Sequence, residues 1–279
     1  MRLTVESVLQ QTSSDWLLTV IDDAYPDPTI GNYLASLGDP RVRYIRKLHN
    51  EGITENFRSC VAEATQEMMM ILGADDLLMP AYVQTVMDAH RRYPQAAIVQ
   101  PGVQVIDEDG HRVSTLVDVV KQQLIRPKTR TSPLLAGEKL ATSLMQGDWL
   151  YWPSLVFRTD RIRGVDFRDF DVIQDLALVV DMICRGDLLL VEPTVCFSYR
   201  RHSASASALK LVDGSRFEGE REYYDSAAVQ TKALGWRKAQ RAAKLRITSR
   251  LHALVLVPST LARADRRALA VLLRHALGR

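Results

Sequence analysis

The sequence predicts an α/β fold in which a mostly parallel sheet is flanked by helices. Along the first hundred residues, short apolar runs of strand length alternate with segments whose apolar residues recur at helical spacing. The strand-like runs are apolar throughout, as expected for parallel strands covered by helices on both faces. In such sheets ligands bind outside the carboxyl ends of the strands, so the residues that follow each run are the first candidates for a site.

The amino-terminal elements follow from the spacing of apolar residues and from turn-forming residues between them. Leu3, Val5 and Val8 predict a helix that ends near Thr12. The remaining expected elements are a strand over Trp16–Asp23, a short helix ending near Leu37, a strand over Val42–Arg46, a helix over Ile53–Ala64, a strand over Met68–Leu72, a helix opened by Pro80 and ending at Tyr93, and a strand over Ala96–Gln100.

Composition indicates a soluble globular protein. The chain has 279 residues, 47% apolar and 25% charged, and no apolar run approaches the roughly 20 residues needed to span a bilayer. The first eleven residues lack the apolar core and cleavage site of a signal peptide. Three widely separated cysteines, Cys60, Cys184 and Cys196, are typical of reduced thiols. We therefore expect a cytoplasmic protein.

Positive charge is concentrated at the carboxyl-terminal end. From Arg237 onward there are eleven Arg or Lys and one acid, so this tail carries +10 in a chain of net charge +3. We expect two helices interrupted at Pro258. Leu269, Leu272, Leu273 and Leu277 are expected to share one helical face, flanked by Arg266, Arg267 and Arg274. Either these helices pack on the rest of the protein, or they attach to an anionic membrane surface. Nucleic acid is not an expected partner, because the tail lacks interleaved aromatic residues.

Two pairs of adjacent acids follow predicted strands. Asp22 and Asp23 end the run WLLTVIDD, and Asp75 and Asp76 follow the run MMMIL. One such pair is commonly a helix cap or a turn former. Two pairs at neighbouring strand ends favour a shared ligand site, where a cation relieves the repulsion between carboxylates. Mg²⁺ or Mn²⁺ fits, because these ions bind carboxylates together with substrate phosphates.

A different class of protein shares part of this pattern. The acids of VIDD, followed later by Asp76 in the spacing D-x-x-M-P, imitate the phosphoacceptor site of a response-regulator receiver, and the basic tail would then be its output region. The interval between Asp23 and Asp76 is long for a receiver, and no Lys-Pro follows a suitable strand end. Phosphorylation of Asp76 by acetyl phosphate would distinguish the two interpretations.

Five segments in order resemble family-2 glycosyltransferases with a GT-A fold. SVLQQTSSDWLLTVIDDAYPDPT (Ser7–Thr29) is similar to that family's first helix, second strand and DDGS-type turn. The further similar segments are HNEGITENF (His49–Phe57) for the N-x-G loop, MILGADDLLMP for the D-x-D region, IQDLAL (Ile173–Leu178) for the E-D motif, and YRRHSASAS (Tyr199–Ser207) for the closing segment. The resemblance covers about Ser7 to Ser207.

The resemblance implies a role for each candidate residue around the donor. Asp23, with Asp22 beside it and Asn50 in the N-x-G loop, would hold the nucleotide of a nucleoside-diphosphate sugar. Asp75 would bind the metal, and Asp76 would support Asp75 or contact the ribose. His202 would be a further metal or phosphate contact, and Arg201, or Arg200 beside it, would pair with phosphate.

The resemblance also implies an inverting transfer in which Asp175 is the general base for an acceptor hydroxyl. From its spacing alone, Asp175 is better explained as a structural acid in the first turn of a helix. Trp149, Tyr151 and Trp152 would stack on a sugar, or serve as core aromatics. The acceptor is expected to be a glycan or a lipid-linked molecule of the cell envelope, with transfer in the cytoplasm or at the inner face of the membrane.

Three features depart from the family pattern. Gly73 replaces the first D-x-D acid, and Gln174 replaces the Glu before Asp175. The chain also begins within the first helix, so the first strand and nucleotide loop are expected to be missing. We expect a GT-A domain over residues 1–210 and a basic helical extension over residues 211–279. A truncated, inactive remnant of such an enzyme is the alternative.

Overall fold

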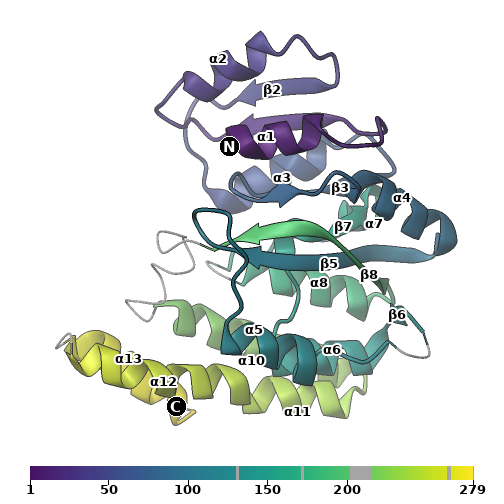
Figure 1. Ribbon diagram of the computed structural model, residues 1–279. Coiled ribbons are helices and arrows are strands. Elements are labelled where there is room, and N and C mark those ends of the chain that lie inside the picture. Colours follow the sequence, from purple (N-terminus) through teal and green to yellow (C-terminus); the bar gives the residue numbers. More distant parts are fainter. Residues whose placement is uncertain (130–131, 171–172, 202–214, 263–264, 279) are drawn as a thin grey trace. The chain divides into compact units, whose positions relative to one another are not determined.

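A computed structural model describes residues 1–129, 132–170, 173–201, 215–262 and 265–278 (Figure 1). The chain forms two compact units, each built from three segments. Unit 1 comprises Met1–Val113, Leu150–Phe167 and Leu188–Arg200, and unit 2 comprises Ser114–Trp149, Arg168–Asp187 and Arg201–Arg279. The predicted domain boundary at residue 210 lies outside the described residues and stays a prediction.

Unit 1 is an α/β unit with its elements in the predicted alternation. Its helices are α1 (Arg2–Leu9), α2 (Thr29–Ser36), α3 (Ile53–Glu63), α4 (Tyr82–Arg92), the 3₁₀ helix η2 (Trp152–Ser154) and α7 (Thr159–Ile162). Its strands are β1 (Leu18–Asp22), β2 (Val42–Arg46), β3 (Met68–Met70), β4 (Leu77–Leu78), β5 (Ala96–Ile106), β7 (Val156–Arg158) and β8 (Leu188–Arg200).

The strands of unit 1 belong to two hydrogen-bonded sheets. β1 and β2 pair in parallel, with Leu18 opposite Val42 and Asp22 opposite Arg46. The larger sheet has the order β3-β7-β5-β8-β4. Its longest ladder, between β5 and β8, is parallel, whereas the short pairings of β3, β4 and β7 are antiparallel. The two longest ladders are thus parallel, which confirms a mostly parallel sheet.

Each sheet of unit 1 has its own apolar packing. Val5 of α1, Val20 of β1 and Leu34 of α2 form one buried cluster, so the two helices cover the small sheet. In the larger sheet, Ile98, Val99 and Phe197 are fully buried. Pro101 and Gly102 mark an irregularity in the β5–β8 register. A Cβ at Gly102 would lie 2.7 Å from the Pro193 carbonyl oxygen, so glycine is required there.

Unit 2 is mostly helical. Its elements are α5 (Leu116–Val120), the π-helix η1 (Lys121–Ile125), β6 (Leu134–Leu135), α6 (Gly137–Gln146), α8 (Gln174–Cys184), α10 (Ser215–Ala233), α11 (Arg237–Leu245), α12 (Ile247–Ala262) and α13 (Arg266–Ala276). α6 packs against both α8 and α11, and α12 packs against α13. The basic tail therefore forms part of a packed helical unit.

A polar network and an apolar cluster join the helices of the tail. Phe217, Ala253, Leu272 and Ala276 form a buried cluster from α10, α12 and α13. Beside it, the Ser249 hydroxyl donates to the Glu220 carboxylate and lies 2.8 Å from His275 Nε2. Burial lowers the pKa of His275 to about 4, so this imidazole is neutral at ordinary pH and fits the apolar interior.

Two local predictions are wrong, both because tertiary contacts outweigh a local preference. β3 ends at Met70 rather than Leu72, and Ala74 and Asp75 turn the chain toward β4. Pro258 lies inside α12 and does not end it. Packing of Ala253, Leu256 and Val257 on the apolar cluster offsets the hydrogen bond that Pro258 cannot donate.

Candidate functional site

The first acidic pair is fixed by the parallel pairing of β1 with β2. Asp22 is buried, and its carboxylate accepts the backbone N–H of Tyr25 at 2.7 Å and the phenol O–H of Tyr44 at 2.5 Å. Arg46 Nε lies 3.9 Å from the same carboxylate. Asp22 therefore organises the turn after β1, as a turn-forming acid does, while its neighbour Asp23 faces another segment.

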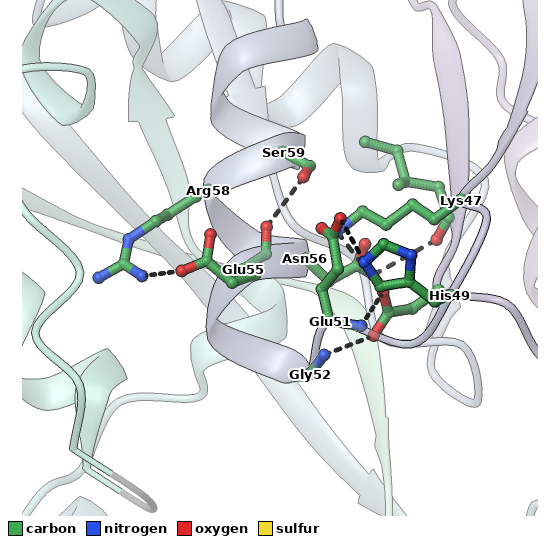
Figure 2. A network of polar contacts seen from close by, with 10 residues as sticks. Lys47, His49, Glu51, Gly52, Glu55, Asn56, Arg58 and Ser59 are labelled. Atoms are coloured by element: carbon green, nitrogen blue, oxygen red, sulfur yellow. Dashed lines mark hydrogen bonds and ion pairs between the residues drawn. The ribbon is translucent and has the colours of Figure 1, made fainter.

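Asp23 anchors the loop between β2 and α3. Its two carboxylate oxygens accept the backbone N–H groups of Glu51 at 3.0 Å and Gly52 at 2.9 Å. Lys47 Nζ lies 3.5 Å from Asp23 and 2.7 Å from the Glu51 carboxylate. Figure 2 shows Lys47, Glu51 and Gly52 converging at the start of α3. The loop is thus held by its own backbone donors and one cation.

The electrostatics of this loop favour an ionised Asp23. Partial burial opposes the charged form, but the N–H groups of Glu51 and Gly52 and the Lys47 ammonium outweigh it and lower the pKa of Asp23. Gly52 has a φ of +89°, which lets the chain turn into α3. Asn50 is exposed in the same loop. The structure thus brings Asp23 and the Asn50 loop together.

The second acidic pair lies in the turn between β3 and β4. Asp76 is 1% exposed, and its Oδ1 accepts the backbone N–H of Arg200 at 2.8 Å. The Arg200 guanidinium donates to the carbonyl oxygens of Asp75, Asp107 and Glu108 at 2.8–2.9 Å. Arg200 therefore joins the end of β8 to the turn that carries both acids.

Helix α1 and Gln11, which follows it, hold the same turn from another direction. The Thr4 hydroxyl donates to the Ala74 carbonyl at 2.8 Å, and the Ser7 hydroxyl accepts the Leu78 N–H at 3.1 Å. The Gln11 side chain donates to the Met79 carbonyl at 2.8 Å. These contacts bracket Asp75 and Asp76 on both sides and limit the movement of the turn.

The carboxylates of the second pair converge over Gly73. A Cβ at this residue would lie 2.5 Å from Asp76 Oδ2 and 3.2 Å from Asp75 Oδ1. Oxygens from two carboxylates thus face one small space that only glycine leaves open. This donor set fits a hard divalent cation such as Mg²⁺ or Mn²⁺, which prefers carboxylate oxygens. Gly73, which stands where the family has the first D-x-D acid, therefore leaves room for the carboxylates of Asp75 and Asp76.

A second group of possible metal ligands lies in the turn after β5. Ligand atoms of Asp107, Asp109 and His111 all lie within 4.8 Å of one another. The Asp107 carboxylate also accepts the N–H groups of Asp109 and His111, as in an ordinary tight turn. These three residues stand at alternate positions and do not form an adjacent pair like the two acidic pairs, so the sequence did not predict this group.

Unit 2 contains the proposed general base. Asp175 lies in the first turn of α8, and its Oδ1 accepts the N–H of Leu176 at 2.7 Å. Burial and the negative charge of Asp148 raise the pKa of Asp175 to about 6, although Arg216 opposes the shift. A carboxyl group with this pKa is ionised at neutral pH and still accepts a proton readily. Asp148 was missed in the sequence because no local pattern links it to Asp175.

The other predicted residues of unit 2 have varied surroundings. Gln174 is 5% exposed and starts α8. The Arg201 guanidinium donates to Asp118 Oδ1 at 2.6 Å and to the Thr115 hydroxyl at 3.1 Å, so a carboxylate already neutralises it. His202 and the rest of the closing segment to Ser207 lie outside the described residues.

The three candidate aromatics, Trp149, Tyr151 and Trp152, have different surroundings. Trp149 is 1% exposed and donates its indole N–H to the Ser143 hydroxyl, so it is a core residue of unit 2. In unit 1, the Trp152 ring packs against those of Phe57, Phe157 and Phe167. The Tyr151 ring lies 5.3 Å from that of Tyr199. For Trp149 the core interpretation holds.

Comparison with known proteins identifies a family whose match includes both acidic pairs. Residues 1–145, more than half of the chain, match the protein family described as "Glycosyl transferase family 2". The chain is 28% identical over 131 residues to "Putative glycosyltransferase EpsE" of Bacillus subtilis (strain 168), covering 45% of this chain and 46% of that protein. It is 34% identical over 113 residues to "Uncharacterized protein y4gI" of Sinorhizobium fredii (strain NBRC 101917 / NGR234), covering 39% of this chain and 12% of that protein. The chain thus spans less than half the length of either curated relative.

Solved structures share the fold over nearly the whole chain. The crystal structure of S. aureus TarS 1–349 has a TM-score of 0.67 at 10% identity, covering 99% of this chain and 76% of that chain. TarS 1–349 in complex with UDP-GlcNAc has a TM-score of 0.61 at 11% identity, covering 99% and 87%. The predicted α/β fold is confirmed. Among the described residues, no helix is both long enough and apolar enough to cross a membrane.

Proposed function

Because the chain belongs to glycosyl transferase family 2, we propose that it transfers a sugar from a nucleoside-diphosphate sugar to an acceptor hydroxyl. The family match carries this proposal, because the matched residues include both acidic pairs and the loop anchored by Asp23. The structural likeness to TarS, which was crystallised with UDP-GlcNAc and with UDP, supports a uridine nucleotide as the first donor to test.

On the donor side, the loop from Lys47 to Gly52 would receive the nucleotide. Asp23 holds this loop in place and retains acceptor lone pairs for a base N–H, while Asn50 is exposed beside it. Asp75 and Asp76 would hold Mg²⁺ or Mn²⁺ through the oxygens that face Gly73. When bound, the cation supplies Lewis-acid stabilisation of the leaving diphosphate.

On the acceptor side, we assign Asp175 as the general base. It would take the proton from the acceptor hydroxyl as that oxygen attacks the anomeric carbon and the nucleoside diphosphate leaves. One base and one displacement give inversion at that carbon. The raised pKa supports this role, because proton acceptance is most effective when the pKa lies near the working pH.

The remaining assignments are Arg201 and His202 as phosphate or metal contacts, with Arg201 held ready by Asp118. The acceptor would be a glycan or a lipid-linked molecule used in building the cell envelope. Transfer at the inner face of the membrane would then call for peripheral contact through the carboxyl-terminal helices. Their charge of +10 supports such contact with an anionic surface.

Calorimetric titration of UDP with and without Mn²⁺ tests the donor site. Wild-type protein should bind UDP more tightly when Mn²⁺ is present, and Asp75→Asn should lose that increment. Asp15→Asn, which changes an exposed acid, is the matched control and should behave as wild type. Unchanged metal-dependent binding in Asp75→Asn would contradict the role of Asp75. Failure of the wild type to bind UDP, GDP, CDP or dTDP would contradict the donor class.

A further inference from the structure

Helix α12 has an apolar side that unit 2 leaves exposed. This apolar stripe consists of Ile247, Leu251, Leu254, Val255 and Leu261, each between 49% and 74% exposed. Their three- and four-residue spacing places them on one face of the helix. The opposite face carries Ser249, Ala253 and Thr260, which are at most 9% exposed. The named residues of the buried face are small and partly polar, whereas the larger apolar side chains of the stripe are exposed, which reverses the usual placement of an amphipathic helix.

The stripe contains no charge. The one charged residue within α12, Arg250, lies outside it and donates to the Ala276 carbonyl oxygen at 2.9 Å. Pro258, also exposed, lies within the same sector of the helix. Isolated exposed apolar residues are common on proteins, but five on one helix face form a continuous surface of the kind that marks an interaction site.

Helix α11 presents a basic face immediately before the stripe. This basic face consists of Arg237, Lys238, Arg241 and Lys244, all exposed, whereas Ala239 and Ala243 on the other side are fully buried. A single residue, Arg246, separates α11 from α12. In Figure 1, α11, α12 and α13 lie together along one edge of unit 2. The exposed cations of α11 are therefore followed directly along the chain by the exposed apolar side chains of α12.

The tail itself contributes few acids to this edge, although Glu138 of α6 accepts the backbone N–H of Lys238 and Asp225 of α10 lies 3.7 Å from Arg246. From Arg237 onward the sequence has one acid, Asp265, and its carboxylate caps α13 by accepting the N–H of Ala268 at 3.0 Å. Helix α13 adds exposed Arg267, Arg274 and Leu273, and its C-cap residue Leu277 is also exposed. Of the leucines expected to share one helical face, Leu272 is buried, so the apolar surface of the tail is mainly that of α12.

We infer that the apolar stripe and the basic face seat unit 2 on an anionic lipid surface. The leucine and valine side chains enter the boundary of the acyl chains, and the four cations lie among the anionic headgroups. A second copy of this chain fits less well, because a two-fold contact would set basic faces against each other. Nucleic acid offers no partner for the exposed leucines. The biological reason for such binding rests on the proposed function. Lipid binding itself requires neither the sugar donor nor the acceptor.

The test is flotation of the full chain with vesicles of phosphatidylcholine, alone or mixed with phosphatidylglycerol. Wild-type protein should float with the anionic vesicles, less so in high salt, and not with the neutral ones. Arg241→Glu with Lys244→Glu should weaken binding at least tenfold, since each cation near such a surface contributes roughly fivefold. Leu251→Ser with Val255→Ser should also weaken it, because less apolar surface enters the membrane.

Matched controls come from α10 of the same unit. Val229→Ser, at a residue 72% exposed, and Lys232→Glu, at an exposed residue, should leave flotation unchanged. Wild-type protein that fails to float, or paired variants that float as well as wild type, would overturn the inference. So would equally tight binding of a DNA duplex at the same salt concentration. Calorimetry with UDP on the same samples separates failure of lipid binding from failure of donor binding.

Discussion

Asp23 and Asp175 are both acids at the end or start of a regular element, yet their environments act in opposite directions. Two backbone N–H groups and Lys47 surround Asp23 and lower its pKa. Burial and Asp148 act on Asp175 and raise its pKa to about 6. The first environment stabilises a permanent anion that anchors a loop. The second makes ionisation costly and so prepares a group that accepts a proton.

The largest expected effect separates the two acids by activity. Asp175→Asn keeps the shape of the side chain and removes its ability to accept a proton, so turnover should fall by about 10²–10⁴-fold. The affinity for the donor, measured by calorimetry, should stay within about twofold. Asp15→Asn should leave both quantities unchanged. Turnover near the wild-type value in Asp175→Asn would leave this acid with only a helix-terminal role.

The pH dependence of turnover should follow Asp175 and not Asp23. The base form of Asp175 is lost as the pH falls through about 6, so turnover should drop about tenfold for each further pH unit. Asp148→Asn removes the neighbouring negative charge and should move the midpoint to lower pH. Rates measured from pH 4.5 to 8 test both expectations, and an unmoved midpoint in Asp148→Asn would contradict the electrostatic account.

Stability should change with opposite sign at the two acids. Because the pKa of Asp175 is raised, its ionised form destabilises the fold at neutral pH, and Asp175→Asn should increase the free energy of unfolding by roughly 1–3 kcal/mol. Because the pKa of Asp23 is lowered, its contribution is present above the ordinary pKa and is lost as the pH falls below it. Asp23→Asn should therefore destabilise by about 1–2 kcal/mol at pH 7.

Urea unfolding at pH 7 measures both changes, and hydrogen exchange at Glu51 and Gly52 locates the second. Faster exchange at these two amides is expected only in Asp23→Asn. A common sign for the two stability changes would show that the contrast between the acids is not electrostatic.

The smallest effect concerns the acidic pair beside Gly73. Gly73→Ala would push a methyl group against Asp76, so metal-dependent UDP binding should weaken by a few-fold. Gly219→Ala, at a helical position with open space, is the control and should increase stability slightly. Unchanged binding in Gly73→Ala would show that the turn yields without disturbing the carboxylates.

The helices and strands were predictable where the local spacing of apolar residues indicates them. Alternating apolar runs gave the elements of unit 1, and the resemblance to GT-A glycosyltransferases gave their arrangement, which the structural likeness confirms. The two acidic pairs were visible because each follows an apolar run. The roles of Asp148 and Arg200, and the contact of Lys47 with Asp23, were not visible, because the partner in each case lies far along the chain. The N–H of Arg200, for example, meets Asp76 across 124 residues.

The tail shows the same limit for a helix. Periodicity indicated amphipathic helices in the tail, but Pro258 suggested a break that α12 does not have. Which leucines stay exposed depends on how Phe217 and Leu272 pack between helices, and local spacing does not specify this tertiary packing. Local spacing defines a face of a helix without saying whether that face meets protein or another medium.

The pairing of β5 with β8 has a consequence for synthesis on the ribosome. Roughly 80 residues separate the end of β5 from the start of β8, and most of them belong to unit 2. At about 5–20 residues per second, β5 waits roughly 4–16 s for its parallel neighbour to be made. During that time its apolar edge is open to chaperones and to other nascent chains. Slowing translation between residues 107 and 187 should therefore lower the soluble yield of the full chain.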